Sequence, residues 1–433
     1  MEERNAVSKR IAIVGAGPIG LEAALFAAHA AFDVKVFERG RVADNILDWG
    51  HVRLFSPFGL NTSKLGRKAV ANSSNELTFP NDTALLTGRE FAESYLIPLS
   101  QLPELVDKIH QHVEVRSISR SRTWKNELIG QEARSHDSFR LLLYDAGRRH
   151  ERYAEADYVL DCSGTYGNHN WIGAGGMPCI GETSALTNDD YRLAEISSSN
   201  RPSKFSGQRT LVIGTGYSAA TSVVALAKLA ESAKGTQVVW LTRRERTPPI
   251  LRIKNDFLPE RGRLTDAANQ LAMDPDSPVR WLPGRLVRQI ERRPDGKGFK
   301  VHVQNTVSHS RIQATYPSDE RLIVDHVFAN VGYRPDRQLY EELQVHECYA
   351  TGGPIKLAAA LLSETSPDCL EQKSRGVQTL RNPEPGFFIL GSKSYGRDSR
   401  FLLKTGFEQI REAFTLIAGN EREIRLTLMT ESP

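Results

Sequence analysis

Three glycines near the N-terminus have the spacing of a turn that binds a dinucleotide. Gly15, Gly17 and Gly20 follow an apolar run at residues 11–14 and precede a segment rich in alanine and leucine. The first glycine allows a tight turn, the second lets the backbone approach a diphosphate, and the third lets helix and strand pack closely. The expected helix presents free N–H groups and the positive end of its dipole to the diphosphate.

An acidic residue stands at the end of the next expected strand, residues 33–37. This residue, Glu38, follows Gly20 by 18 positions (38 − 20), where a carboxylate accepts hydrogen bonds from a ribose diol. The glycine triplet alone is weak evidence, but strand, glycines, helix, strand and acid all occur here in order. The residues predicted to form this first cofactor site are Gly15, Gly17, Pro18, Gly20, Glu38 and Arg39.

The same order of elements recurs at residues 209–246 with a different ending. The strand expected at 237–241 is followed by Arg243 and Arg244 instead of an acid. Guanidinium groups can bind a 2′-phosphate through paired hydrogen bonds, whereas a carboxylate would repel it. A solvated basic turn is the alternative interpretation. The residues predicted to form this second site are Gly214, Gly216, Ser218, Ala219, Arg243 and Arg244, with Ala219 at the third glycine position.

The different endings of the two units indicate two different dinucleotides. We expect FAD at the first unit, because Glu38 suits a ribose diol, and NADPH at the second, because arginines suit a 2′-phosphate. Two such units with opposite endings carry more weight than either motif alone.

The remaining sequence indicates how the two units are joined. Segments 157–164 and 322–332 each combine an apolar strand with a terminal glycine, and we expect them to be the crossing points between domains. The prediction is an α/β fold with two Rossmann-like dinucleotide-binding domains, the NADPH domain being inserted into a discontinuous FAD domain. The expected bounds are 1–165 and 320–433 for the FAD domain, 200–319 for the NAD(P)H domain and 166–199 for a connecting segment.

A third strand near the C-terminus, residues 386–390, leads into a helix expected at about 401–418. Ligands of such sheets bind beyond the carboxyl ends of the strands. The glycines that end these strands, Gly164, Gly332 and Gly391, are therefore predicted cofactor contacts. Lys404, at the start of the helix, is a candidate for a positive charge beside the reduced flavin.

Composition excludes several other classes of protein. In this 433-residue chain 56 basic residues nearly balance 52 acidic ones, so no nucleic-acid partner is expected. No run of 18 apolar residues occurs and the charged N-terminus lacks a secretory pattern, which favours a cytoplasmic protein without a membrane partner. The four cysteines form no Cys-x-x-Cys pair, and no metal site is predicted.

The order of parts resembles the flavin-dependent superfamily that joins thioredoxin-reductase-like enzymes with flavin-containing monooxygenases. The resemblance covers nearly the whole chain. A thioredoxin-type reductase needs a redox cysteine pair, which is missing here. The loop with Asn61, followed by Phe79-Pro80 and an expected helix, is similar to the monooxygenases, which place an asparagine beside the flavin. Asn61 is therefore the candidate catalytic residue.

Two positions depart from the monooxygenase pattern. Leu211 stands where the fingerprint that begins at Phe205 and Gly207 has a histidine, and Gly391-Ser392 replaces a Gly-Asp pair that often contacts the ribityl-phosphate. The resemblance implies an NADPH-dependent FAD oxidoreductase that uses molecular oxygen to hydroxylate or oxygenate a small soft nucleophile, an amine or a sulfide. The alternatives are a flavin reductase or electron-transfer dehydrogenase without a redox disulfide, and a non-catalytic flavin-binding redox sensor. A homo-oligomer is compatible with the sequence.

Overall fold

The computed structural model describes residues 8–73, 78–196, 203–254, 256–305, 319–363 and 375–418. Its backbone contacts divide the chain into two compact units, one of Met1–Asn168 with Arg334–Pro433 and one of His169–Tyr333. The first unit is therefore discontinuous. The sequence predicts the connecting segment at 166–199; of its described residues, 169–196 fall in the second unit, where Gly173 and Ile180 form bridges to one strand.

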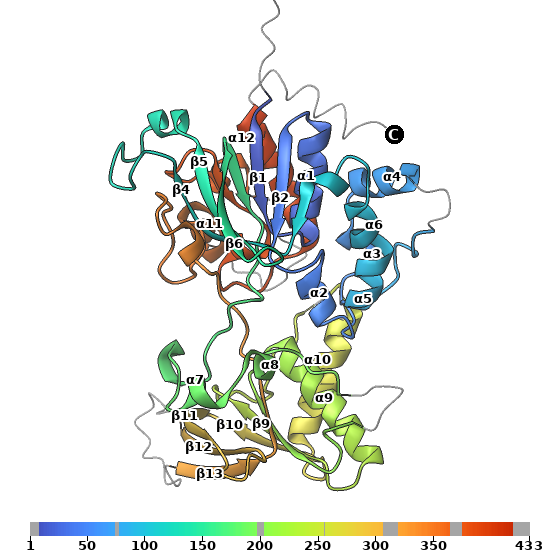
Figure 1. The fold of residues 1–433 in the computed structure, drawn as a ribbon. Coiled ribbons are helices and arrows are strands. Elements are labelled where there is room, and N and C mark those ends of the chain that lie inside the picture. Colours follow the sequence, from blue (N-terminus) through green and yellow to red (C-terminus); the bar gives the residue numbers. More distant parts are fainter. Residues whose placement is uncertain are drawn as a thin grey trace, which may run out of the picture. The chain divides into compact units, whose positions relative to one another are not determined.

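The first unit contains a five-stranded parallel sheet in the order β15-β7-β1-β2-β3 and an antiparallel sheet in the order β4-β5-β6 (Figure 1). Its strands are β1 Arg10–Val14, β2 Asp33–Glu38, β3 Ile109–Gln111, β4 Val113–Arg120, β5 Phe139–Asp145, β6 His150–Ala156, β7 Tyr158–Asp161 and β15 Phe387–Ile389. Its helices are α1 Pro18–His29, α2 Asp44–Asp48, α3 Phe58–Asn61, α4 Lys64–Ser73, α5 Gly88–Phe91, the π-helix η1 Ala92–Leu96, α6 Ile97–Ser100, α11 Ile355–Leu362 and α12 Leu403–Ala418.

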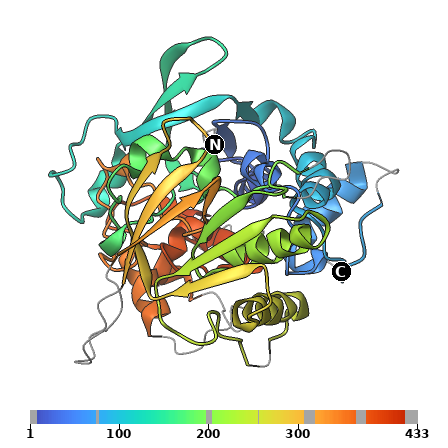
Figure 2. The same ribbon diagram turned by 90° about the horizontal axis from the view of Figure 1, so that it is seen from below.

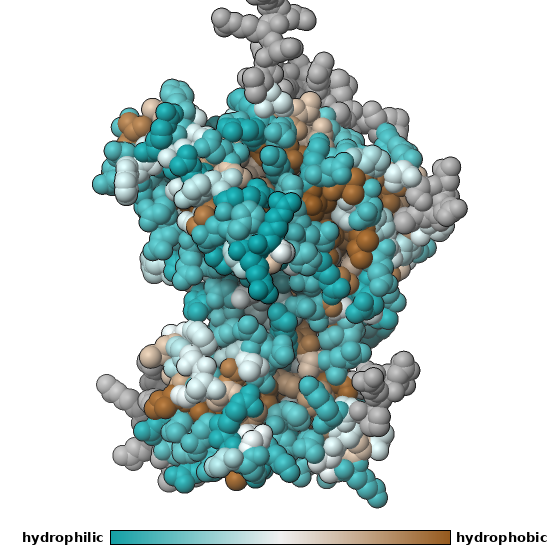
Figure 3. Space-filling model, in the orientation of Figure 1, coloured by the Kyte–Doolittle hydropathy of each residue, from teal (hydrophilic) through white to brown (hydrophobic). Residues whose placement is uncertain are grey.

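The parallel sheet of the first unit is buried on both faces. Ile11 and Ile13 of β1 pack in one core with helices α1 and α12, while Ala12 and Val14 pack in another with the β4-β5-β6 sheet. A strand covered on both sides reads as a continuous apolar run, which is how residues 11–14 appear in the sequence. On the face shown in Figure 3, hydrophobic residues of this unit gather around α1 and α6, on the helical side.

The second unit repeats this architecture. A parallel sheet in the order β10-β9-β8-β14 is covered on one side by an antiparallel sheet in the order β11-β12-β13. Helices α9 and α10 contact each other and strands of the parallel sheet (Figures 1 and 2). The elements of this unit are α7 Glu182–Ala185, α8 Asn188–Tyr191, β8 Arg209–Ile213, α9 Tyr217–Ser232, β9 Gln237–Thr242, α10 Pro259–Met273, β10 Val279–Pro283, β11 Arg285–Arg292, β12 Phe299–Asn305, β13 Asp319–Val324 and β14 His326–Ala329.

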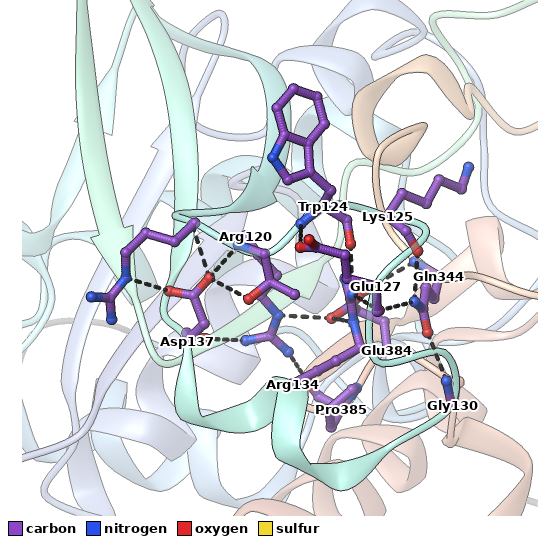
Figure 4. A network of polar contacts seen from close by, with 12 residues as sticks. Arg120, Trp124, Lys125, Glu127, Gly130, Arg134, Asp137, Gln344, Glu384 and Pro385 are labelled. Atoms are coloured by element: carbon purple, nitrogen blue, oxygen red, sulfur yellow. Dashed lines mark hydrogen bonds and ion pairs between the residues drawn. The ribbon is translucent and has the colours of Figure 1, made fainter.

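A buried charge network fixes the long β4–β5 connection of the first unit to the chain just before β15. Arg120 and Arg134 both pair with Glu384, at 2.7 and 2.8 Å, and the three side chains are fully buried (Figure 4). Arg134 also donates to the carbonyl oxygens of Trp124 and Glu127, so the connection closes around its guanidinium. Breaking such a pair from one side costs about 3–5 kcal/mol, so the network holds the amino-terminal end of β15 in place.

Candidate functional site

The first glycine turn has the geometry that its spacing predicts. Gly15 has φ +99°, and a Cβ there would lie 2.9 Å from the carbonyl oxygen of Cys162, so only glycine fits. A Cβ on Gly20 would lie 1.9 Å from the Gly15 carbonyl oxygen, which explains the close packing of α1 on the turn. A Cβ on Gly17 would meet nothing within 4 Å. The open space lies at the N-terminus of α1, where N–H groups and the helix dipole favour a diphosphate.

Glu38 holds this turn in shape and still offers acceptors. Its carboxylate accepts hydrogen bonds from the N–H groups of Ala16 and Gly40, both at 2.8 Å. Each carboxylate oxygen has further lone-pair capacity for a ribose hydroxyl. Arg39 is exposed, and its guanidinium lies 3.2 Å from where a Cβ of Gly167 would stand. The residues expected around a ribose and a diphosphate therefore lie at one edge of the parallel sheet.

The carboxyl ends of β7 and β15 meet beside this turn. Gly164 and Gly391 both have positive φ, +69° and +74°. The Ser392 hydroxyl lies 3.6 Å from where a Cβ of Gly164 would be, so the two strand ends are close neighbours. Lys404, expected to carry the charge beside a flavin, is exposed in the first turn of α12. The buried cation at this edge is instead Lys393, which the sequence analysis missed because it stands in a polar segment resembling a surface loop.

Asn61 lies at the end of α3, buried and held by one neighbour. Its Oδ1 accepts from the Ser56 hydroxyl at 2.7 Å, and its Nδ2 donates to the Ser56 carbonyl at 3.0 Å. The loop that follows is tied to α1 by the buried Glu22, which accepts from the hydroxyls of Ser63 (2.6 Å) and Tyr95. Burial raises the pKa of the Glu22 carboxyl and, with Glu22, that of the Tyr95 hydroxyl. Asn61 stays a prediction, and the sequence analysis did not name Glu22 and Tyr95, which hold the loop after it.

Aromatic side chains near Asn61 pack against one another. Phe58 is buried and lies 5.9 and 6.2 Å, between ring centroids, from Phe79 and Tyr95. Arg53 donates a hydrogen bond to the Leu85 carbonyl, which ties its loop to the segment before α5. These contacts leave Asn61 as the one predicted catalytic side chain of this loop.

The second glycine turn matches the first in its backbone. Gly214 has φ +135°, and a Cβ there would lie 2.2 Å from the carbonyl oxygen of Asn330. Gly216 opens onto free space at the N-terminus of α9. Ala219 is fully buried beside the turn, so alanine fills the third glycine position. The indole of Trp240 donates to the Gly214 carbonyl at 2.8 Å, which holds the turn on β9.

The strand end of the second unit presents its arginines to solvent. Arg243 and Arg244 are exposed, and within the described ranges neither side chain forms an ion pair or hydrogen bond. The backbone of this turn is held by the buried Thr242, whose hydroxyl donates to the Arg244 carbonyl at 3.3 Å. Gly332, with φ +79°, follows β14, which pairs with β8 on the other side from β9. Side chains on a fixed turn, without protein partners, suit an anionic ligand. Ser218 is partly buried in the first turn of α9.

The described cysteines form no disulfide. Cys162, Cys179 and Cys348 are free and buried, and Cys369 lies outside the described residues. Burial raises the pKa of the Cys162 thiol, and burial beside Glu182 raises that of Cys179 to about 12. Both are therefore neutral thiols at neutral pH and poor nucleophiles.

Within the described ranges, no group of His, Cys, Asp and Glu could hold a metal ion. None of the helices in these ranges is both long and apolar enough to span a membrane.

Comparisons with known proteins agree with this architecture. Residues 12–129 match the family described as pyridine nucleotide-disulphide oxidoreductase. The bacillithiol disulfide reductase of Bacillus cereus has a similar structure, with a TM-score of 0.65 and 17% identity over 95% of this chain and 99% of that one. An ornithine N-hydroxylase of Kutzneria sp. 744, solved with reduced FAD, NADP⁺ and L-ornithine, has a TM-score of 0.57 and 14% identity over 95% and 99%.

A short curated match adds little. An uncharacterized protein of Methanocaldococcus jannaschii is 30% identical over 104 residues, which are 24% of this chain and 22% of that protein. The similar structures establish the fold: the chain shares an α/β architecture of two Rossmann-like units with a bacillithiol disulfide reductase and an ornithine N-hydroxylase. This confirms the resemblance and the α/β fold class predicted from the sequence.

Proposed function

We propose that the chain is an NADPH-dependent FAD oxidoreductase. The observation that carries this proposal is the contrast between its two glycine turns. They share one backbone geometry, but one strand ends in Glu38, anchored on backbone N–H groups. The other is followed by Arg243 and Arg244, which are exposed and have no side-chain partner among the described residues. The first ending suits a ribose diol and the second a 2′-phosphate. FAD supplies redox chemistry, and the protein orients it and sets its electrostatic surroundings.

The residues of the first unit have separate tasks in this proposal. The open space at Gly17 and the N-terminus of α1 receive the diphosphate of FAD, and Glu38 binds the ribose. Gly164 and Gly391 leave the strand ends free of side chains where the rest of the cofactor passes. In the second unit Gly216 and the N-terminus of α9 receive the diphosphate of NADPH.

The finer proposal is a monooxygenase that acts on an amine or a sulfide. NADPH, a proton, oxygen and the substrate would then give NADP⁺, water and the oxygenated product. Two features support this class over a dithiol reductase: the sequence lacks a Cys-x-x-Cys pair, and Cys162, beside the first turn, is a buried neutral thiol. Asn61 is proposed to donate a hydrogen bond from Nδ2, whose second hydrogen is not used by Ser56.

A second candidate is an NADPH-dependent reductase that passes electrons to another acceptor. It is favoured by the similarity to the bacillithiol disulfide reductase, the higher of the two TM-scores given above. The histidine position of the monooxygenase fingerprint is Leu211, a fully buried core residue of β8, which also fits a reductase.

Isotopically labelled oxygen separates the candidates. The purified protein should release FAD on denaturation and be reduced by NADPH faster than by NADH under anaerobic conditions. Admission of labelled oxygen with a panel of primary amines and sulfides should then place one labelled atom in a product and the other in water. Label found only in hydrogen peroxide would favour the reductase. Absence of NADPH oxidation with every acceptor would contradict both proposals.

A variant pair links this readout to Asn61. Asn61→Asp keeps the size of the side chain and the acceptor for the Ser56 hydroxyl, but removes the N–H donor, including the hydrogen bond to the Ser56 carbonyl. We expect reduction by NADPH to continue while labelled product falls relative to hydrogen peroxide. Asn81→Asp, in an exposed turn of the same unit, is the matched control and should leave this ratio unchanged.

A further inference from the structure

A buried ion pair lies at the carboxyl edge of the first sheet. Lys393 Nζ is 2.6 Å from Asp161 Oδ2, and the exposed fractions of the two side chains are 1% and 0%. The Lys393 ammonium donates a hydrogen bond to the Ser163 hydroxyl at 3.0 Å. That hydroxyl in turn donates to Asp161 Oδ1 at 2.6 Å. The three side chains thus form a closed triangle of one cation, one anion and one hydroxyl.

The triangle is built directly against the first glycine turn. Asp161 is the last residue of β7, and Ser163 follows it by two positions. A Cβ on Gly15 would lie 3.2 Å from the Cα of Ser163, so a single residue separates the ammonium from the turn. Lys393 comes from the short 3-10 helix η8, Gly391–Tyr395, which follows β15. The pair therefore joins the two strand ends that border the turn.

The second unit has no such pair at the corresponding place. In the registers of the two parallel sheets, Val14 lies opposite Asp161, and Ile213 lies opposite Ala329. Val14 and Ile213 each precede the first glycine of their turn, so Ala329 is the counterpart of Asp161. The ion pair is thus not a requirement of the backbone that the two units share. A buried pair is also seldom worth more to stability than apolar residues of similar size.

We propose that Lys393 and Asp161 are a positioning pair that sets the affinity of the first glycine turn for an anionic diphosphate. The proposal rests on the assignment of FAD to this turn. The Lys393 ammonium attracts the diphosphate, and the Asp161 carboxylate holds the ammonium in place and offsets part of its charge. Both charges are screened little because they are buried. Removal of Lys393 therefore makes the local charge more negative, and removal of the Asp161 carboxylate makes it more positive.

The test compares FAD binding to the apoprotein in three variants, by quenching of flavin fluorescence. Lys393→Met leaves the carboxylate alone and should raise the FAD dissociation constant about tenfold or more. Asp161→Asn keeps an acceptor for Ser163 but leaves the ammonium alone, and should lower the constant by about threefold or more. The double variant should return to within about threefold of the wild type. ADP, which carries the diphosphate without the flavin, should follow the same order.

Glu384→Gln is the matched control for a lost buried charge. Glu384 is as buried as Asp161 and lies before β15, at its other end, so its variant should melt at a lower temperature with unchanged FAD affinity. If Lys393→Met does not fold, Asp161→Asn and the double variant still decide the matter. Equal weakening in both single variants, or no change in either, would overturn the proposal. A wild-type apoprotein that does not bind FAD would contradict the proposed function instead.

Discussion

The two glycine turns of this protein share a backbone and differ in their surroundings. In both, the N–H of the first glycine donates to a carbonyl oxygen of the adjacent strand. Gly15 donates to Phe37 at 2.8 Å, and Gly214 donates to Leu241 at 3.1 Å. In both, the residue just after an adjacent parallel strand packs against that glycine, Cys162 after β7 and Asn330 after β14. The first turn is bordered by acids and a buried lysine, and the second by exposed arginines. The common backbone creates a diphosphate site, and the side chains around it select the dinucleotide.

The largest effects are expected from a methyl group added at the first glycine of each turn. Gly214→Ala would place a Cβ 2.2 Å from a carbonyl oxygen at positive φ, which should cost the second unit about 2–3 kcal/mol. Reduction by NADPH should be lost while FAD remains bound. Gly15→Ala should instead lose FAD while the second unit still binds NADPH. The measurements are the melting temperature and the flavin content of the purified protein.

Gly216→Ala and Gly17→Ala are the controls, because a Cβ at either position meets nothing within 4 Å. Both should fold with unchanged melting temperature and lose affinity only for the dinucleotide of their own turn. Loss of FAD in Gly214→Ala would show that the turns are not independent, and would break the comparison.

Removal of a single arginine should have the next largest effect. Arg244→Ala should raise the NADPH dissociation constant about tenfold, equivalent to ~1.4 kcal/mol, and leave that of NADH nearly unchanged. Arg39→Ala is the matched control, because Arg39 is an exposed arginine that follows the corresponding strand of the first unit. An unchanged preference for NADPH over NADH in Arg244→Ala would leave Arg243 and Arg244 as a solvated basic turn.

Glu38 should contribute somewhat less. Glu38→Gln keeps one acceptor but turns the other into a donor that faces a backbone N–H. FAD affinity should fall about fivefold, near 1 kcal/mol, while the NADPH dissociation constant stays constant. An equal fall for both dinucleotides would indicate general destabilisation, and isothermal titration with each ligand distinguishes the two results.

The sequence predicted what is local and missed what is assembled over distance. Each glycine turn and the residue that ends its unit, Glu38 or the arginines, lie within about 40 residues of one another. Over such a stretch, spacing and strand pattern determine geometry. The pairing of Arg120 with Glu384 spans 264 residues, so no spacing rule reveals it. Lys393 was missed both because it stands in a polar segment and because its partner Asp161 lies 232 positions earlier (393 − 161). Long-range charge pairs depend on which strands become neighbours in the sheet.

The smallest expected effect concerns the helices that begin at the two turns. Glu22 of α1 is a buried acid, whereas its counterpart in α9, Thr221, donates to its own helix at the Tyr217 carbonyl. Because burial raises the pKa of Glu22 in the folded state, its contribution to stability is full below the ordinary range of a glutamate and is lost as pH rises through the folded-state pKa.

Glu22→Gln should therefore remove the pH dependence that this buried carboxyl contributes in the first unit. Relative to wild type, the variant should gain melting temperature as pH rises above the ordinary range of a glutamate, and show no such gain in acid. Thr221→Val in the second unit should leave the pH profile of melting unchanged. A wild-type profile identical to that of Glu22→Gln would mean that the hydrogen bonds from Ser63 and Tyr95 fully offset the burial of the carboxylate. The two helices would then respond alike to pH, and the difference between the units would be confined to the strand ends.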